Sequence, residues 1–249
     1  MDELAAKLVG KFLVVDGPDG AGKTTQLGLL RNRLDQMGLR VQVAVDPGTT
    51  RIGQKIRSLL LDRDNGEIGP MCETLLFMAS RAQLVDELVR PALEEGRVVL
   101  CDRFISATIA YQGASGVDVD AIIRIGRIAV RDLLPDLTIV LDIPTDIGFQ
   151  RIGVRRPRLK KPGAEELEKL GVETRRSPSV PKVLRKQLRL FGDRVERRNS
   201  EYHDRVRTFF HKLPDLYPAP VSCIDAAGTP QEVHERICKA VLEWASRNA

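Results

Sequence analysis

The octapeptide Gly-Pro-Asp-Gly-Ala-Gly-Lys-Thr at residues 17–24 constrains this chain more than any other feature. It fits the pattern G-x-x-x-x-G-K-[ST], whose glycines let backbone N–H groups turn inward around phosphate oxygens. A continuous apolar run at 11–16 precedes the octapeptide, and leucines at helical spacing follow it. In this order of strand, turn and helix, the positive end of the helix dipole points at a bound anion. The chain is therefore predicted to bind nucleotide phosphates.

Individual side chains of this loop have expected roles. Lys23 is expected to reach the β- and γ-phosphates, and the Thr24 hydroxyl is expected to ligate Mg²⁺. The expected ATP phosphate-binding set is Gly17, Asp19, Gly20, Ala21, Gly22, Lys23, Thr24 and Thr25.

Strand and helix patterns alternate along the chain. A continuous apolar run predicts a strand at 11–16 that is buried on both faces. Short segments rich in apolar residues predict further strands at 40–45, 97–101, 137–141 and 221–224. Helical spacing of apolar residues predicts helices at 23–37, 52–61, 70–89, 117–133 and 229–244. The alternation predicts an α/β fold, with a five-stranded, mostly parallel sheet and helices on both faces. Asp102 and Asp142 would then lie near the phosphate-binding loop at 17–24, the P-loop. All three would be at the carboxyl edge of the sheet, where such sheets bind ligands.

Composition narrows the range of partners. The net charge of +5 favours an anionic partner, either a nucleotide or a nucleic acid. Aromatic residues make up only 4% of the chain, so a base-stacking platform for single-stranded nucleic acid is not expected. The four cysteines form no C-x-x-C pair, which predicts no zinc site, no disulfide and a reducing cytoplasmic location. Neither a signal peptide nor a membrane span is expected.

A P-loop alone does not identify the reaction. The chain has no N-K-x-D tetrapeptide of the kind that GTPases use for guanine. Neither Asp102 nor Asp142 has the acidic neighbour that motor ATPases usually carry at this position. Instead, the third strand is followed by Asp-Arg-Phe at 102–104 and Tyr-Gln-Gly at 111–113. Together with the P-loop, these segments favour a small-molecule kinase.

Over nearly its whole length, the chain resembles bacterial thymidylate kinases. The matching segments share order and approximate spacing, and lie at 17–26, 75–81, 102–104, 110–113, 141–142 and 193–196. The resemblance implies a P-loop nucleoside monophosphate kinase fold over residues 1–249, as one domain with a basic lid inserted at about 151–198. It also implies transfer of the γ-phosphoryl group of MgATP to dTMP, and a homodimer.

The resemblance further implies roles on the acceptor side. Arg103 would hold the acceptor phosphate, and Tyr111 would lie beneath the sugar and disfavour a 2′-hydroxyl. Asp19 would contact the sugar 3′-hydroxyl or the Mg²⁺ shell, Phe77 would stack on thymine, and Arg81 would donate hydrogen bonds to the base. The implied dTMP-binding set is Asp19, Asp46, Phe77, Arg81, Arg103, Thr108, Tyr111 and Gln112, and the implied metal set is Thr24, Asp19 and Asp102.

Residue chemistry agrees with part of this assignment. Phe77 and Arg81 are four residues apart, so on a helix both project from one face, where an aromatic ring and a planar donor suit a base. The alternative is that Phe77 is ordinary core, that Arg81 lies in solvent and that Tyr111 is simply packed.

Phosphoryl transfer requires charge neutralisation and the exclusion of water. Arg151, Arg155 and Arg156 lie at the start of the basic lid that the resemblance implies. Positions 18–21 hold no basic residue, so the chain resembles family members whose catalytic arginine lies in the lid, and Arg155 is favoured. The expected catalytic set is Lys23, Asp19, Arg103, Arg155 and Arg151.

The segment at 158–190 is longer than the usual lid of the family and rich in Arg, Lys and Pro. A short helix is expected at 164–170. One interpretation is a solvated, flexible loop, because such a composition does not build a core. The other is an extended lid or a contact for another anion, although no nucleic-acid recognition motif is present.

Two positions depart from the family pattern. Val45 replaces an arginine that usually helps to bind the acceptor phosphate, and Ala107 replaces a common serine. Arg51 or Arg57 could supply the missing positive charge. Two alternatives to a dTMP kinase therefore stay open: a kinase for another deoxynucleotide or a deoxynucleoside, and a non-catalytic nucleotide-binding paralogue. The presence of Lys23, Thr24, Asp19 and Arg103 argues against the paralogue, whereas Val45 leaves it open.

Overall fold

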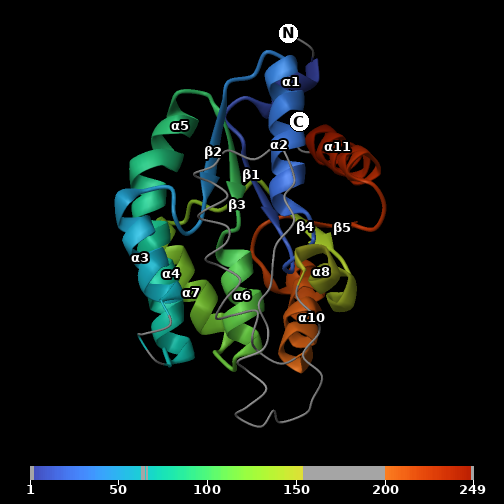
Figure 1. Ribbon diagram of the computed structural model, residues 1–249. Coiled ribbons are helices and arrows are strands. Elements are labelled where there is room, and N and C mark those ends of the chain that lie inside the picture. The colour runs from blue at the N-terminus through green and yellow to red at the C-terminus, as the bar shows by residue number, and fades with distance from the viewer. Residues whose placement is uncertain (1–2, 63–64, 66, 154–199, 248–249) are drawn as a thin grey trace.

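The computed structural model describes residues 3–62, 65, 67–153 and 200–247. Five strands form one sheet in the order β2-β3-β1-β4-β5, and every pair of neighbours is parallel (Figure 1). The strands are β1 (Phe12–Asp16), β2 (Val41–Val45), β3 (Val98–Asp102), β4 (Leu137–Asp142) and β5 (Val221–Asp225). The predicted α/β class and its five strands are confirmed, and the sheet is wholly parallel.

The helices include all five predicted ones and several others. They are α1 (Glu3–Leu8), α2 (Lys23–Gln36), α3 (Arg51–Leu61), α4 (Pro70–Leu84), α5 (Arg90–Glu94), α6 (Ile105–Ala114), α7 (Val119–Val130), α8 (Thr145–Ile152), α10 (Ser200–Leu216) and α11 (Pro230–Arg247). A π-helical turn, η2 (Val85–Val89), joins α4 to α5, so the helix predicted at 70–89 continues to Glu94. The helix expected at 164–170 lies outside the described residues.

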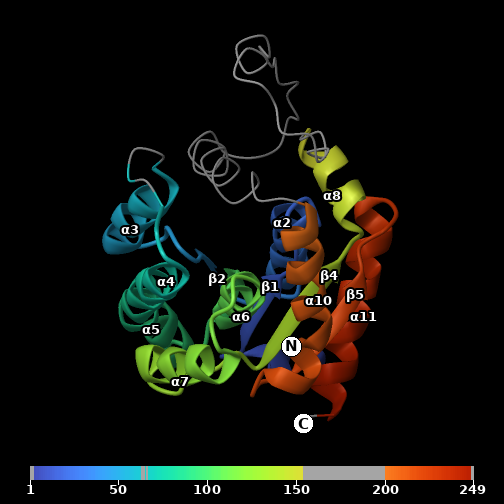
Figure 2. The same cartoon turned by 90° about the horizontal axis from the view of Figure 1, so that it is seen from below.

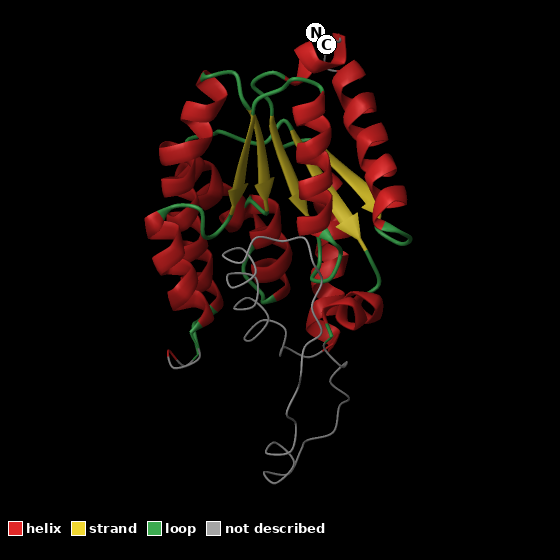
Figure 3. Cartoon of the chain, turned by 45° about the horizontal axis from the view of Figure 1, so that its top comes forward, coloured by secondary structure: helices red, strands yellow, loops and turns green. Residues whose placement is uncertain are grey.

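Helices cover both faces of the sheet (Figures 2 and 3). Alternate residues of a strand point to opposite faces, so each strand contributes to both layers. In β1, Phe12 and Val14 join a core formed with α4, α6, α7 and α10. Leu13 and Val15 join a second core formed with α1, α2 and α11. Because both faces are covered, β1 is buried throughout, as its unbroken apolar sequence predicts.

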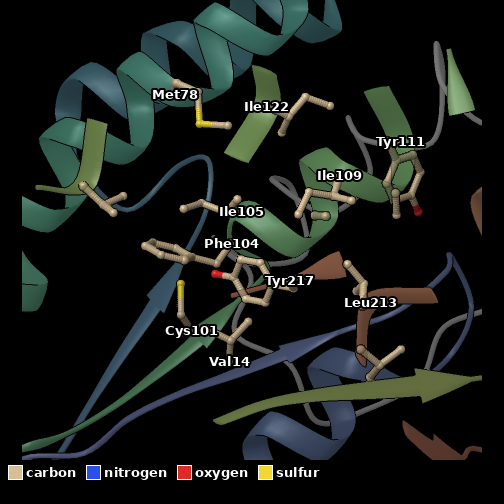
Figure 4. Packing of buried hydrophobic residues seen from close by; sticks show 14 of the residues in the cluster. Val14, Met78, Cys101, Phe104, Ile105, Ile109, Tyr111, Ile122, Leu213 and Tyr217 are labelled. Carbon is tan, nitrogen blue, oxygen red and sulfur yellow. The ribbon is translucent and has the colours of Figure 1, made fainter. Parts of the chain in front are cut away.

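Aromatic packing fixes the segment that follows β3 (Figure 4). Phe104 is fully buried and meets Phe12 edge to face, with ring centroids 5.0 Å apart. Cys101 is also fully buried and packs in this core as a small hydrophobic residue. Arg103 lies between these two anchored residues, so its backbone position is set by the core.

The carboxyl ends of the strands lie at the edge of the sheet remote from the two marked termini (Figure 3). The P-loop follows β1 at this edge, and Asp102 and Asp142 end β3 and β4 there. Both aspartates are the last residues of their strands, one residue later than the predicted strand ends. In the described part of the chain, no helix is long and apolar enough to cross a membrane.

Candidate active site

The P-loop encloses one end of a pocket of about 370 Å³. Asp19, Gly20, Gly22, Lys23, Thr24 and Thr25 line this pocket, which brings together most of the predicted phosphate-binding set. Gly17 and Ala21 do not line it. Lys23 points back across the loop, where its Nζ donates hydrogen bonds to the carbonyl oxygens of Gly17 at 3.0 Å and Pro18 at 2.9 Å. Burial, together with the nearby Arg103 guanidinium, lowers the pKa of Lys23 to about 8.

Thr24 and Asp102 provide oxygen ligands at the mouth of the P-loop. The Thr24 hydroxyl lies 3.5 Å from a carboxylate oxygen of Asp102, and both residues line the same pocket. Mg²⁺ prefers oxygen ligands and is usually held by one or two side chains together with substrate phosphates and water. This pair therefore fits the predicted metal, although the described residues contain no cluster of three His, Cys, Asp or Glu side chains that could hold an ion by themselves.

Arg103 lies at the centre of a buried polar network. Its Nη2 donates to Asp19 Oδ1 at 2.6 Å and lies 3.3 Å from the hydroxyl of Tyr111, which in turn donates to Asp19 Oδ2 at 3.0 Å. Burial acts to raise the pKa of Asp19, but Arg103 and Lys23 outweigh it and hold that pKa below its usual value. Both carboxylate oxygens of Asp19 are thus engaged, one by Arg103 and the other by Tyr111.

Asp16 is a member of this network that the sequence analysis missed. It is fully buried and accepts hydrogen bonds from the Ser106 hydroxyl at 2.6 Å and the Gly17 N–H at 2.8 Å. Arg103 Nη1 lies 3.5 Å from the same carboxylate. Asp16 therefore joins the start of the P-loop to the start of α6 and to Arg103. Its place at the end of an apolar strand, directly before the P-loop, was the available signal.

A second pocket adjoins the first and contains the predicted acceptor residues. It is lined by Asp46, Phe77, Arg81, Arg103, Ala107, Thr108, Tyr111 and Gln112. Every residue of the implied dTMP-binding set except Asp19 lines this pocket. Arg103 and Asp46 line both pockets, so the two spaces meet at these side chains.

Arg81 is only 1% exposed, so its alternative interpretation as a solvated side chain is wrong. Its Nε donates to Asp46 Oδ2 at 2.6 Å, and its Nη2 donates to the carbonyl oxygen of Phe104 at 2.9 Å and lies 3.2 Å from Thr108 Oγ1. These contacts hold the guanidinium in one orientation at the pocket. Phe77 is half-buried on the same helix, one turn away.

The structure distinguishes between the two arginines considered as substitutes at Val45. Arg57 is buried and lines the P-loop pocket beside Val45 and Asp102. Its Nη1 donates to the carbonyl oxygen of Pro47 at 2.7 Å. Arg51 is exposed at the first position of α3. Of the two candidates, Arg57 is therefore the one that the fold places at this wall of the pocket.

One of the predicted lid arginines lies among the described residues. Arg151 is in the last turn of α8, lines the P-loop pocket, and donates from Nη2 to the carbonyl oxygen of Ala226 at 3.1 Å. Arg155, Arg156 and the segment at 193–196 lie outside the described residues.

Sequence comparisons point to one family. The profile of the thymidylate kinase family matches residues 15–176. The chain is 36% identical over 236 residues to the thymidylate kinase of Pelobacter propionicus, covering 94% of this chain and 95% of the relative. It is 37% identical over 241 residues to the thymidylate kinase of Exiguobacterium sibiricum, covering 96% of this chain and 98% of the relative. With its P-loop, its parallel sheet and a second pocket beside the first, the chain belongs to the thymidylate kinase family.

Proposed function

We propose that this chain transfers the γ-phosphoryl group of ATP to dTMP, giving ADP and dTDP. Membership of the thymidylate kinase family supports this function. The observation that carries it in the structure is the position of Arg103, which lines both the P-loop pocket and the adjoining pocket. A cation shared by two such pockets suits a reaction in which two phosphate groups must approach each other.

The reaction exchanges one bond. An oxygen of the dTMP phosphate bonds to the γ-phosphorus of ATP, while the bond from that phosphorus to the oxygen it shares with the β-phosphate breaks. ADP leaves with that oxygen. Protein side chains contribute positioning and positive charge to such a transfer. In this proposal Lys23 binds the donor phosphates, and Arg103, assisted by Arg57, binds the acceptor phosphate.

Mg²⁺ is part of the proposed donor. When bound, it neutralises negative charge on the β- and γ-phosphates. Thr24 and Asp102 are the residues that would hold it, because their oxygens lie together at the mouth of the P-loop.

The acceptor base is proposed to lie in the second pocket. Phe77 would stack on thymine, Arg81 would donate to a base carbonyl, and Thr108 and Gln112 would add polar contacts. Tyr111 would lie beneath the deoxyribose, where its hydroxyl bridges Arg103 and Asp19. Asp46 would act through Arg81, since their ion pair fixes the guanidinium.

The proposal also covers the organisation of the protein. We infer that residues 1–249 form one kinase domain, with a lid at about 151–198 that supplies Arg155. We also infer that the enzyme acts in the cytoplasm and forms a homodimer. Light scattering coupled to size exclusion tests the dimer directly, because a mass near 28 kDa instead of twice that value would contradict it.

A coupled assay of ADP release tests the function with dTMP, dUMP, dCMP, dGMP and thymidine as acceptors. The proposal predicts turnover with dTMP and none with thymidine. Turnover with thymidine alone would indicate a deoxynucleoside kinase, and a preference for another monophosphate would indicate a different deoxynucleotide kinase. ATP binding without turnover on any acceptor would indicate a non-catalytic nucleotide-binding protein.

A further inference from the structure

We propose that Glu73 is a positioning residue that determines base specificity, because it fixes the orientation of the Gln112 amide at the acceptor pocket. In that orientation Gln112 selects a base that carries a hydrogen atom on its N3 ring nitrogen. The inference rests on the proposed function, since it explains how the same pocket distinguishes one pyrimidine from another.

The two side chains form a buried pair between α4 and α6. Gln112 is 3% exposed and lines the acceptor pocket, and Glu73 is 4% exposed in the first turn of α4. Gln112 Nε2 donates a hydrogen bond to Glu73 Oε2 at 3.2 Å. With so little exposure, bulk water does not compete for this contact.

The chemistry of the pair allows only one orientation of the amide. An ionised carboxylate accepts hydrogen bonds and cannot donate, so only the NH₂ end of an amide can face it. The positive end of the α4 dipole favours the negative charge of Glu73. Turning the amide over would bring its carbonyl oxygen against the carboxylate and leave two buried acceptors facing each other, which is strongly unfavourable.

This orientation leaves the carbonyl oxygen of Gln112 for a ligand, because no described residue donates to it. Thymine and uracil carry a donor at N3, which this oxygen can accept. Cytosine carries a lone pair at N3, which the oxygen would repel. Arg81 is held separately by Asp46, and its donors suit the 4-oxo group of thymine or uracil but not the 4-amino group of cytosine.

The Glu73→Gln variant tests this assignment. An amide at position 73 can donate as well as accept, so both orientations of Gln112 become possible. We expect the ratio of kcat/KM for dTMP to that for dCMP to fall at least tenfold. The kcat/KM for dTMP and the kcat/KM for dUMP should change by the same factor, because both bases carry a hydrogen at N3. An unchanged ratio of dTMP to dCMP in a folded Glu73→Gln enzyme overturns the inference.

The chain offers a matched control. Gln83 Nε2 donates to Glu87 Oε2 at 2.9 Å in an exposed pair of the same chemistry. Glu87→Gln makes the same chemical change away from the pocket, and the ratio should stay at the wild-type value. If the ratio of kcat/KM for dTMP to that for dCMP fell as much in Glu87→Gln as in Glu73→Gln, a local role for Glu73 would be contradicted.

A second variant keeps the test decisive if Glu73→Gln fails to fold in a thermal unfolding assay. Gln112→Met keeps the length of the side chain but removes its acceptor, so kcat/KM should fall for dTMP while that for dCMP does not. Retained preference for dTMP in this variant overturns the inference. Wild-type protein that phosphorylates neither dTMP nor dUMP would instead contradict the proposed function, and with it this inference.

Discussion

Gly148 of α8 lies directly against Gly20 of the P-loop. A Cβ atom on Gly20 would lie 2.1 Å from the carbonyl oxygen of Gly148, and one on Gly148 would lie 2.5 Å from the carbonyl oxygen of Asp19. Neither position can carry a side chain unless the two backbones separate. Because α8 also carries Arg151 to the P-loop pocket, this backbone contact fixes the position of α8 beside the P-loop.

Gly148→Ala should therefore impair catalysis. The added methyl group would push α8 away from the P-loop, lowering kcat about tenfold and the free energy of unfolding by about 1–3 kcal/mol. Steady-state kinetics and urea unfolding measure the two effects. Gly28 is the control, since it is an exposed residue of α2 with open space around its Cβ position. Gly28→Ala should keep wild-type kcat, and a Gly148→Ala enzyme that did the same would refute the positioning role.

Arg103→Ala should raise the KM for the acceptor nucleotide strongly. A lost hydrogen bond to a charged group costs about 1.5–3 kcal/mol, which corresponds to roughly 10- to 150-fold in KM. The control is Arg127→Ala, because the side chain of Arg127 is exposed, forms an ion pair with Asp132 and lines neither pocket. This variant should leave the kinetics unchanged. Unaltered acceptor kinetics in Arg103→Ala would contradict the assigned role.

ATP binding should weaken at alkaline pH through Lys23. Its pKa in the free protein is about 8, so the side chain is charged below pH 8 and loses its charge as the pH rises through that value. Calorimetric titration with a non-hydrolysable ATP analogue between pH 7 and 9.5 should show affinity falling above pH 8. The affinity of the Lys23→Arg protein for the analogue should not change over this pH range, because arginine stays protonated. Parallel pH profiles for the two proteins would exclude Lys23 as the cause.

Arg155→Ala should lower kcat far more than it weakens ATP binding. The favoured lid guanidinium is expected to act mainly on the transition state, where such a group contributes about 10³-fold or more. Arg151→Ala provides the comparison, since Arg151 lines the P-loop pocket. If Arg151→Ala loses kcat while Arg155→Ala keeps it, Arg151 is the catalytic arginine.

Asp142 stabilises the junction between β4 and α10. It accepts two hydrogen bonds of 2.8 Å from Arg207, and His211 lies 3.1 Å away. Burial acts to raise its pKa, but the bonds from Arg207 and the nearby His211 hold that pKa below its usual value. Asp142→Asn should lower the free energy of unfolding by about 1–2 kcal/mol at neutral pH.

The pH dependence of this difference follows from the sign of the shift. A carboxyl whose pKa is lowered on folding contributes stability that is present above its unfolded value, about 3.9, and is lost as the pH falls below it. Chemical unfolding of both proteins from pH 7 to pH 3 should show the two curves converging in acid. A difference that does not depend on pH would mean that the ionised form of Asp142 is not its source.

The sheet could be predicted because its buried parallel strands are rich in apolar residues. The P-loop could be predicted because the phosphate motif lies between the apolar run of a strand and leucines at helical spacing. Helix α6 was missed for a physical reason. All ten of its residues are buried, so it has no polar face to reveal a helical period. The segment was read as a set of motifs, although those motifs lie on a helix that carries Thr108, Tyr111 and Gln112 to the pocket.

Pairs formed through tertiary contacts could not be predicted either. Phe77 and Arg81 share a helix, so their common face followed from spacing alone. The partners of Asp16 and Glu73 lie 90 and 39 residues away in the sequence, and only the fold brings them together. Spacing likewise could not choose between Arg51 and Arg57, because the choice depends on which side of α3 faces the pocket.

Transfer of an isotopic label tests the central claim most directly. The enzyme would be incubated with ATP labelled in its γ-phosphoryl group and with dTMP, and the products would be separated. We predict that the label appears in the β-phosphate of dTDP, and that Lys23→Ala and Arg103→Ala each reduce its appearance strongly. Label that remains in ATP, or that appears only as inorganic phosphate, would contradict the claim that Arg103 unites two nucleotide pockets in one transfer reaction.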